Sequence, residues 1–308
     1  MSKRRKNSGP RTSGPRTSAP RRTGTRGAAP REKVRDVFVV RPFEGLADEA
    51  EWIALRELVP AATAPLTLAP ELAAAHGDPD VLLVSVLPGA APVIVRPDGQ
   101  IVLALQRQQQ SGDVNRDLAC SLLAALETEP GRPVAVPPLP GEGPRLADVI
   151  VDGPLDVTVH DGFAFWAGPE GADSPQWAAV LEQANAAAYP TRKLAAASGA
   201  YWCQAAARAH VRWVLADDED AALAALARLA AAGELLLGDD TKFAGMFRVH
   251  GRLAPVWDLP HDAPAESWEP AVAALAGRYA AALADDSPLT AEQRRARQGL
   301  LGRQLSLR

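Results

Sequence analysis

Cysteine is scarce in this sequence of 308 residues: only Cys120 and Cys203 occur, far apart in the chain. Two isolated thiols supply neither a disulfide framework nor the paired spacing of a zinc site, and they fit a reducing cytoplasm. Long apolar runs are lacking as well, and this excludes a membrane-spanning helix. No apolar segment follows the basic start of the chain, so we expect no secretory signal and a cytoplasmic location.

Residues 1–31 contain no Val, Ile, Leu or aromatic residue. A short repeat runs through them, with SGPRT at 8–12, SGPRT at 13–17 and SAPRRT at 18–23. Such a segment cannot bury enough apolar surface to offset the entropy of ordering, and its spaced prolines exclude a helix. The sequence therefore predicts a disordered tail over residues 1–35.

The net charge of −4 conceals a sharp division along the chain. Residues 1–35 hold twelve Lys or Arg against one acid, a net charge of +11, whereas the remainder holds 21 basic and 36 acidic residues, a net charge of −15. The tail is therefore expected to bind a polyanion such as nucleic acid or the ribosome, or to fold back onto its own acidic body. A flexible, solubilising extension is the alternative.

Aromatic residues are absent among the cations of the tail, so contacts with the phosphate backbone are expected and base stacking is not. The candidate nucleic-acid-binding residues are Lys3, Arg4, Arg5, Lys6, Arg11, Arg16, Arg21, Arg22 and Arg26.

The whole chain is 47% apolar in composition, enough for a full core, and the pattern of its body predicts a mixed α/β fold. We divide it into a first module at 36–128, a Pro/Gly-rich linker at 129–149, a second module at 150–286 and a basic C-terminal helix at 287–308.

The first module is expected to hold three strands, three helices and a hairpin. The strands are predicted at 36–40, 64–68 and 81–87, the helices at 46–59, 70–77 and 113–127, and the hairpin over 92–105. Asp98-Gly99 marks the hairpin turn, and Asp113 is placed to cap the last helix. The continuous apolar run at 81–87 indicates a strand that is buried on both faces.

The second module is expected to hold two hairpins, four helices and a strand. The hairpins are predicted over 156–168 and 247–259, the helices at 175–188, 200–209, 217–233 and 267–284, and the strand at 211–215. His250-Gly251 marks the second turn. Beyond this module, Thr290 and Gln293 form a capping box for the last helix of the chain.

Both modules show the same order of elements: a DVxV strand, a Trp-containing helix, a short strand, a helix, a hairpin and a final helix. An internal duplication explains this order, and so does coincidence, because α/β sequences alternate in any case.

Motifs for known chemistry are missing: the sequence contains no phosphate-binding loop, nucleophile elbow or paired-cysteine metal motif. Thr191, Arg192 and Lys193 could hold an anion if Thr191 caps a helix, although a solvated loop between two helices is the favoured interpretation. The acidic run at 217–220 is interpreted as the first turn of a helix in preference to a metal site. No cofactor is implied.

Lone histidines and the cysteines offer little further indication of a catalytic site. His160 and His250 fall at predicted turns, and His210 precedes a strand, without an identifiable partner for acid–base catalysis. Cys203 is interpreted as a buried helix thiol, since a nucleophile needs an activating neighbour. The tryptophans are expected in the core.

Three stretches, at 41–66, 111–127 and 241–260, resemble an actinobacterial family that is catalogued only as a domain of unknown function. The resemblance implies no catalytic residues. Some relatives carry a label taken from the preprotein-translocase motor, but this chain is too short for that motor and lacks its phosphate-binding loop and cysteine-rich zinc motif.

These observations favour a non-enzymatic binding or adaptor protein, whose tail contacts nucleic acid or the ribosome and whose body binds a protein partner. The alternative is a small-molecule enzyme with an active site between the two modules, near Arg192 and Lys193. A secretion-linked, chaperone-like role is a third hypothesis, which depends on the translocase label alone.

Overall fold

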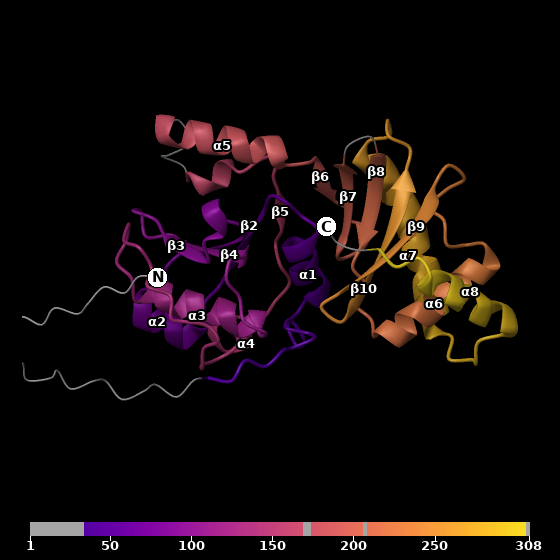
Figure 1. Ribbon diagram of the computed structural model, residues 1–308, viewed down its shortest axis with the longest axis horizontal. Helices are drawn as coiled ribbons and strands as arrows, with labels where there is room; N and C mark the ends of the chain where they lie inside the picture. The colour runs from indigo at the N-terminus through magenta and orange to yellow at the C-terminus, as the bar shows by residue number, and fades with distance from the viewer. Residues whose placement is uncertain (1–33, 169–173, 206–207, 306–308) are drawn as a thin grey trace, which may run out of the picture. The chain divides into compact units, whose positions relative to one another are not determined.

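The computed structural model describes residues 34–168, 174–205 and 208–305. They form two five-stranded sheets with helices packed against them, which confirms the predicted α/β class (Figure 1). The predicted tail lies outside the described residues except for positions 34 and 35, and so do its nine candidate cations from Lys3 to Arg26. No helix in the described ranges is long and apolar enough to cross a membrane.

The first sheet has the strand order β3-β4-β2-β1-β5. Its strands are β1 (Ala62–Leu66), β2 (Val81–Val86), β3 (Val93–Val95), β4 (Ile101–Gln106) and β5 (Thr158–Val159). Neighbouring strands are antiparallel except for β2 and β4, which run parallel. The helices of this half are α1 (Glu49–Glu57), α2 (Pro70–His76), α3 (Val114–Leu126) and α4 (Leu146–Val149), with short 3₁₀ turns at Pro88–Ala90 and Ala164–Trp166.

Both faces of this sheet are covered, as the apolar run at 81–87 predicts. Leu83 of β2 packs in one core cluster with Leu118 of α3, whereas its neighbour Val84 packs on the other face. There it meets Trp166 and, less deeply buried, Trp177 of α5 (Pro175–Ala187). Side chains of successive strand residues point to opposite faces, so a strand between two layers of helix needs apolar residues at every position.

The second sheet is antiparallel throughout, with the order β6-β7-β8-β10-β9. Its strands are β6 (Thr191–Lys193), β7 (Ala200–Ala205), β8 (Arg208–Trp213), β9 (Lys242–Val249) and β10 (Arg252–Leu259). Three helices share a core cluster with one face of this sheet: α6 (Glu219–Ala232), α7 (Glu269–Ala284) and α8 (Ala291–Leu301).

The opposite face of the second sheet packs against α1. Tyr201 of β7 and Phe247 of β9 belong to the same core cluster as Phe43 and Trp52 from the first half. Residues 49–56 of α1 are all buried, because this helix lies between the two halves. A helix buried on all sides would be expected to be apolar all round, yet α1 carries carboxylates inside the interface.

Local end signals are confirmed where the sequence places them. The Asp113 side chain accepts a hydrogen bond from the backbone N of Arg116 at the start of α3. Thr290 and Gln293 form the predicted capping box of α8. The turn between β9 and β10 has positive φ at both central residues, 46° at His250 and 73° at Gly251, as a two-residue hairpin turn requires.

The two sheets correspond in strand order and differ in strand direction. Counted from the hairpin at one edge, the first sheet runs β3-β4-β2-β1-β5 and the second β9-β10-β8-β7-β6. Strands β1 to β4 therefore each match the strand six places later in the chain, whereas β5 matches β6. However, β2 and β4 are parallel, whereas the corresponding β8 and β10 are antiparallel. Strand order therefore supports a duplication only loosely.

Within the helix predicted at 200–209, residues 200–205 instead form β7, and residues 208 and 209 begin β8. Alanine-rich composition favours a helix, but here the side chains alternate between faces. Tyr201 packs toward α1, and Trp202 packs in the cluster of α6 and α7. Strand geometry is what allows neighbouring aromatic residues to enter two different cores.

The hairpin predicted over 156–168 is also absent. β5 pairs with β1, and the chain then enters the 3₁₀ turn, where Trp166 Nε1 donates to the carbonyl of Val86 at 2.8 Å. β5 thus belongs to the first sheet, and the division between the sheets lies after Val159, later than the linker predicted at 129–149. The strand predicted at 36–40 is not formed either, because no neighbouring strand lies beside it within the described residues.

Candidate functional site

The predicted anion site lies on the edge strand β6, and the helix start on which that prediction depends is absent. Thr191 is buried and donates its hydroxyl to the carbonyl of Tyr189. Arg192 pairs with Asp161 at 2.7 Å, and Lys193 pairs with Glu51 at 3.1 Å. Both cations are therefore engaged by acids, and anion binding at this place stays a prediction.

Glu51 of α1 is the most completely enclosed carboxylate of the interface, only 1% exposed. It accepts hydrogen bonds from the Tyr201 hydroxyl at 2.5 Å and from the backbone N of Gly199 at 2.9 Å, besides the ion pair with Lys193. Burial and the neighbouring Glu51 charge raise the pKa of Tyr201, so its hydroxyl remains a donor. This network attaches α1 to β6 and β7.

Glu49, two residues before Glu51 in α1, lies between two guanidinium groups. It accepts from Arg41 Nη2 at 2.8 Å and from Arg252 Nη2 at 2.7 Å. Burial alone raises the pKa of Glu49, but the hydrogen bonds and charges of Arg41 and Arg252 outweigh it, so the pKa lies below the ordinary value. Glu57 at the end of α1 accepts from His250 Nε2 at 2.8 Å.

The junction of the two halves is thus closed by aromatic packing and paired charges. Sequence reasoning missed these carboxylates, because acids in the first turns of a helix are ordinarily solvated. The only signal available was their position beside Trp52 and Ile53 in a helix without a clean polar face.

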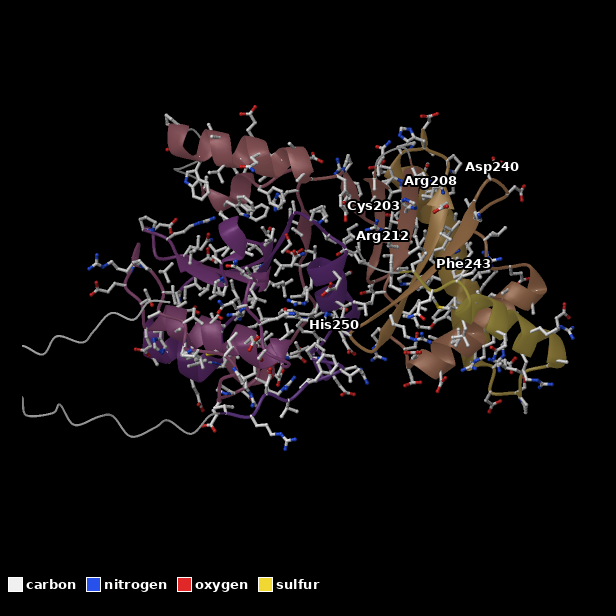
Figure 2. The ribbon with its side chains drawn as sticks, viewed as in Figure 1. Cys203, Arg208, Arg212, Asp240, Phe243 and His250 are labelled. Carbon is white, nitrogen blue, oxygen red and sulfur yellow. The ribbon has the colours of Figure 1, made fainter. Side chains whose placement is uncertain are left out.

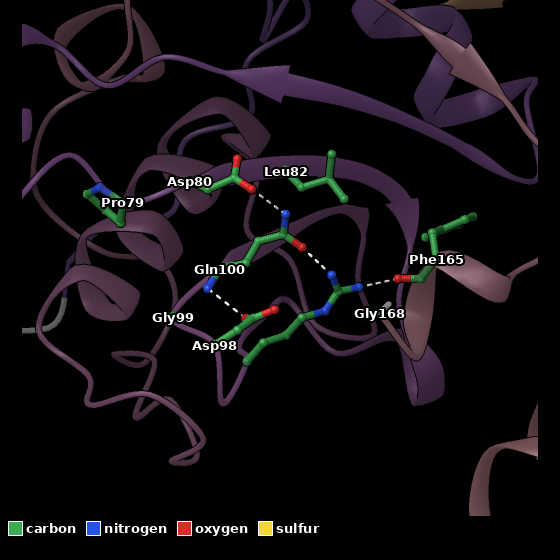
Figure 3. Close-up of a pocket in the computed structure, with 9 residues that line it drawn as sticks. Pro79, Asp80, Leu82, Asp98, Gly99, Gln100, Phe165 and Gly168 are labelled. Atoms are coloured by element: carbon green, nitrogen blue, oxygen red, sulfur yellow. Dashed lines mark hydrogen bonds between the residues drawn. The ribbon is translucent and has the colours of Figure 1, made fainter. Parts of the chain in front are cut away.

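A pocket of about 660 Å³ opens on the first half, beside the turn of the β3–β4 hairpin. It is lined by Asp80, Asp98, Gln100 and Phe165, among others, around the buried Arg96. Figure 3 shows the hydrogen bonds that link Asp80 to Gln100, Gln100 to the guanidinium of Arg96, and that guanidinium to the carbonyl of Phe165. Its volume lies within the range of small-ligand sites.

Arg96 organises this pocket. Its Nη atoms donate to Gln100 Oε1 and to the carbonyl of Phe165, and Gln100 Nε2 donates in turn to Asp80 at 2.5 Å. Burial lowers the pKa of Arg96, although Asp98 and Asp80 act in the opposite direction. Its Nε has no hydrogen-bond partner in the part of the chain that the structure describes. The pocket can hold a ligand by charge and hydrogen bonds, and its lining contains no histidine.

A second set of polar side chains lies in a row across the second sheet. Cys203 is the cross-strand partner of His210, and His210 is the partner of Asp258. His210 Nδ1 lies 3.0 Å from Asp258 Oδ1, which leaves Nε2 on the other side of the ring. Figure 2 marks Cys203 on this sheet together with Arg208 and Arg212.

The row of Cys203, His210 and Asp258 is poorly suited to nucleophilic catalysis, although the three residues are neighbours on adjacent strands. Cys203 is 1% exposed, and burial raises the pKa of its thiol although the Arg212 charge acts to lower it. Burial also lowers the pKa of His210. A nucleophilic cysteine needs a thiolate and an approach for the substrate, and this thiol has neither.

The acidic run at 217–220 is engaged in helix capping and ion pairs. Asp218 caps α6, Asp217 accepts from the Tyr279 hydroxyl at 2.8 Å, and Asp220 pairs with Arg297. This confirms the interpretation as a helix start. Within the described ranges, no group of three or more His, Cys, Asp or Glu residues is placed to hold a metal ion.

The comparison with known proteins agrees with the resemblance seen in the sequence. No curated protein and no solved structure matches the chain. A family model does match, over residues 42–308, and it covers both sheets and all eight α-helices described above. With most of its length inside that match, the chain belongs to a family of unknown function, DUF5926.

Proposed function

We propose that this is a cytoplasmic, non-enzymatic binding or adaptor protein. Its N-terminal tail contacts the phosphates of a nucleic acid, free or within the ribosome, and its body binds a protein partner.

The observation that carries this proposal is the division of charge. Twelve cations against one acid in residues 1–35 form a polyanion-binding segment, whereas the body has a net charge of −15 and repels nucleic acid. The absence of aromatic residues among these cations favours contact with the backbone over readout of bases.

The body supports binding in preference to catalysis. An active site between the halves needs an open, polar cleft, but Trp52, Phe43 and Tyr201 pack there, and the buried acids are paired. The pocket around Arg96 is the place where we expect the partner protein. Asp80 and Asp98 at its mouth form no ion pair with another cation within the described residues, so a basic side chain of the partner fits them.

The test compares full-length protein with a variant that lacks residues 1–35, in binding to single-stranded RNA and duplex DNA at two salt concentrations. We expect tight binding by the full chain at low salt, a steep loss at higher salt and little binding by the deletion variant. On duplex DNA, the logarithm of the binding constant should fall against that of salt with a slope of about 0.9 per phosphate engaged.

The matched control is a tail of identical composition in scrambled order. Electrostatic binding should survive scrambling, because it depends on the number of cations and little on their sequence. Equal binding by the deletion variant and the full chain would refute the role of the tail.

The protein partner is tested separately by affinity purification from cells, with nuclease treatment in parallel. We expect at least one protein to remain bound after nuclease treatment and to be lost on the double substitution Asp80→Asn and Asp98→Asn. Glu71→Gln, an exposed acid on α2, is the matched control.

The second candidate function, a thiol-dependent enzyme, is favoured only by the row of Cys203, His210 and Asp258. Fast alkylation of Cys203 at neutral pH, abolished by His210→Gln, would support it. The burial of the thiol predicts the opposite result.

A further inference from the structure

The Pro/Gly-rich segment that the sequence marks as a linker is part of the folded body. Val134 and Val136 are partly buried against the core cluster of the first sheet. A Cβ on Gly141 would lie 3.7 Å from the Sγ atom of Cys120 on α3. Residues 134–141 therefore form a wall on the first half of the body, which we call the proline wall.

A pocket of about 420 Å³ lies between the proline wall and the end of β4. Three segments line it: residues 89–92 in the turn after β2, residues 107–109 after β4, and residues 136–139 of the proline wall. The backbone N of Gln108 donates to the carbonyl of Ala90 at 3.0 Å, which joins the first two segments. The volume lies within the range of roughly 300–1,000 Å³ that is usual for small-ligand sites.

Arg107 is the single charged residue in the lining of this pocket, which belongs entirely to the described ranges. It is half-buried, and its Nη1 donates to the backbone carbonyl of Asp117 at 2.8 Å. That carbonyl is the one acceptor that the guanidinium has within the described residues, and Nε has none there. The Asp117 carboxylate is engaged elsewhere: it accepts from the backbone N and the hydroxyl of Ser111, at 2.6 Å and 2.7 Å.

The positive charge of Arg107 is thus left without an ion-pair partner in the described part of the chain. Burial lowers the pKa of Arg107, the charge of Asp117 acts to raise it, and the charge of Arg56 lowers it further. Arg56 is itself paired, with Glu57 at 2.9 Å. A buried charge is costly unless it is paired, so an anion that enters this pocket gains an interaction that the chain does not supply.

The lining carries no acid, in contrast to the pocket around Arg96, which Asp80 and Asp98 line. The acids that give the body its net charge of −15 therefore lie outside it, and salt at about 0.1 M screens exposed charges beyond about 10 Å. Gln108 and Gln109 are exposed, and their side-chain amides have no hydrogen-bond partner within the described residues. They add hydrogen-bond donors and acceptors to the same lining.

The rest of the lining is apolar and rigid. Pro92, Pro137, Leu139 and Val136 supply apolar surface. Proline has a fixed φ, and Val136 is packed against the core, so these walls are formed before a ligand arrives. Binding to a preformed pocket costs less conformational entropy than binding that has to order a loop. The pocket therefore presents one unpaired cation and two amides beside a preformed apolar surface.

We propose that this pocket binds a small organic acid. The carboxylate of the ligand pairs with Arg107, and its apolar body lies between the proline wall and residues 89–92. A carboxylate carries one negative charge and matches the planar guanidinium, whereas a phosphate group carries about −1.5 to −2 charges at pH 7 and has no apolar part. One cation beside apolar walls therefore favours the carboxylate.

The test is an NMR titration of the isotope-labelled, full-length chain. The probes are sodium benzoate, the neutral benzamide of nearly the same shape, and inorganic phosphate. We expect benzoate to shift the backbone resonances of Gln108 and Gln109. Judged from these resonances, it should bind at least tenfold more tightly than benzamide and than phosphate. The cations of the tail also attract anions, but the resonances of the pocket report on this site.

Opposite charges at Gln109 test the electrostatics of the pocket. Because this side chain is exposed, Gln109→Glu and Gln109→Lys are both expected to fold, which circular dichroism checks. Gln109→Glu should weaken benzoate binding several-fold, and Gln109→Lys should strengthen it, because the added charge lies in the same lining as Arg107. Benzamide, which is neutral, should bind both variants alike.

Arg107→Gln should abolish the preference for benzoate over benzamide. Arg132→Gln removes an exposed arginine outside the lining, so it is the matched control and should bind benzoate as the wild type does. Arg107→Gln also loses the hydrogen bond to the carbonyl of Asp117, and where it fails to fold, the two Gln109 variants decide.

Four results would each overturn the proposal: no shift with benzoate, equal affinity for benzoate and benzamide, phosphate binding as tight as benzoate binding, or the same benzoate affinity in both Gln109 variants. Every variant retains residues 1–35, so these results do not depend on the nucleic-acid binding proposed above. A tail that fails to bind RNA would leave this site intact, and a pocket that fails to bind benzoate would leave the role of the tail intact.

Discussion

Replacing Glu51 by alanine tests whether the two halves are held together by the buried charges of α1. The substitution leaves the Tyr201 hydroxyl, the backbone N–H of Gly199 and the Lys193 ammonium without their common acceptor. Removal of one partner of a buried ion pair costs about 3–5 kcal/mol. Lys193 is 32% exposed and can turn to water, so we expect the lower end of that range, about 3 kcal/mol.

The assay is urea unfolding followed by tryptophan fluorescence. Tyr201→Phe removes one hydrogen bond to a charged group and should cost about 1.5–3 kcal/mol. Because both changes disrupt one network, the double variant should lose less free energy of unfolding than the sum of the single variants. Glu71→Ala, on the exposed face of α2, should change the free energy by no more than about 0.5 kcal/mol. A Glu51→Ala variant as stable as this control would refute the reasoning.

Three further predictions concern other parts of the body. Because the pKa of Glu49 is lowered in the folded chain, its contribution to stability is complete above its unfolded pKa near 4.5 and is lost as the pH falls through the folded pKa. Glu49→Gln should therefore make the free energy of unfolding depend less on pH in the acid range, and an unchanged dependence would contradict this. Gly251→Ala should destabilise the chain by about 1–3 kcal/mol in urea unfolding, because φ is 73° and the new Cβ would lie 2.3 Å from Arg41 Cγ; no loss would show that the turn relaxes. Iodoacetamide should modify Cys120 faster than the buried Cys203, as peptide mass spectrometry can show, and the reverse order would support a reactive thiol.

Elements with strong local signals could be predicted from the sequence. The acids at 217–220 and Gly233 define α6, and the His250-Gly251 turn defines the β9–β10 hairpin. In such segments the capping residues, the turn residues and the spacing of the apolar residues all favour the same structure. Tertiary packing therefore did not change the secondary structure that the local sequence favours.

Elements that depend on distant partners could not be predicted. Alanine-rich residues 200–205 form a strand because Tyr201 and Trp202 enter two different cores, a fact that no local pattern contains. Residues 36–40 have strand propensity but no neighbouring strand among the described residues, and β propensity expresses packing on neighbours as much as backbone preference. Arg252, which pairs with Glu49, lies 203 positions away in sequence, and Tyr201, which pairs with Glu51, lies 150 positions away, so the buried network could not be predicted either.

The most direct test of the proposed function is the salt dependence of RNA binding by the full chain and by the variant without residues 1–35. The charge division predicts that the full chain binds at low salt with an affinity that falls steeply as salt is added, and that the deletion variant binds little at either concentration. Equal affinity of the two proteins, or an affinity of the full chain that does not change with salt, would contradict an electrostatic attachment through the tail.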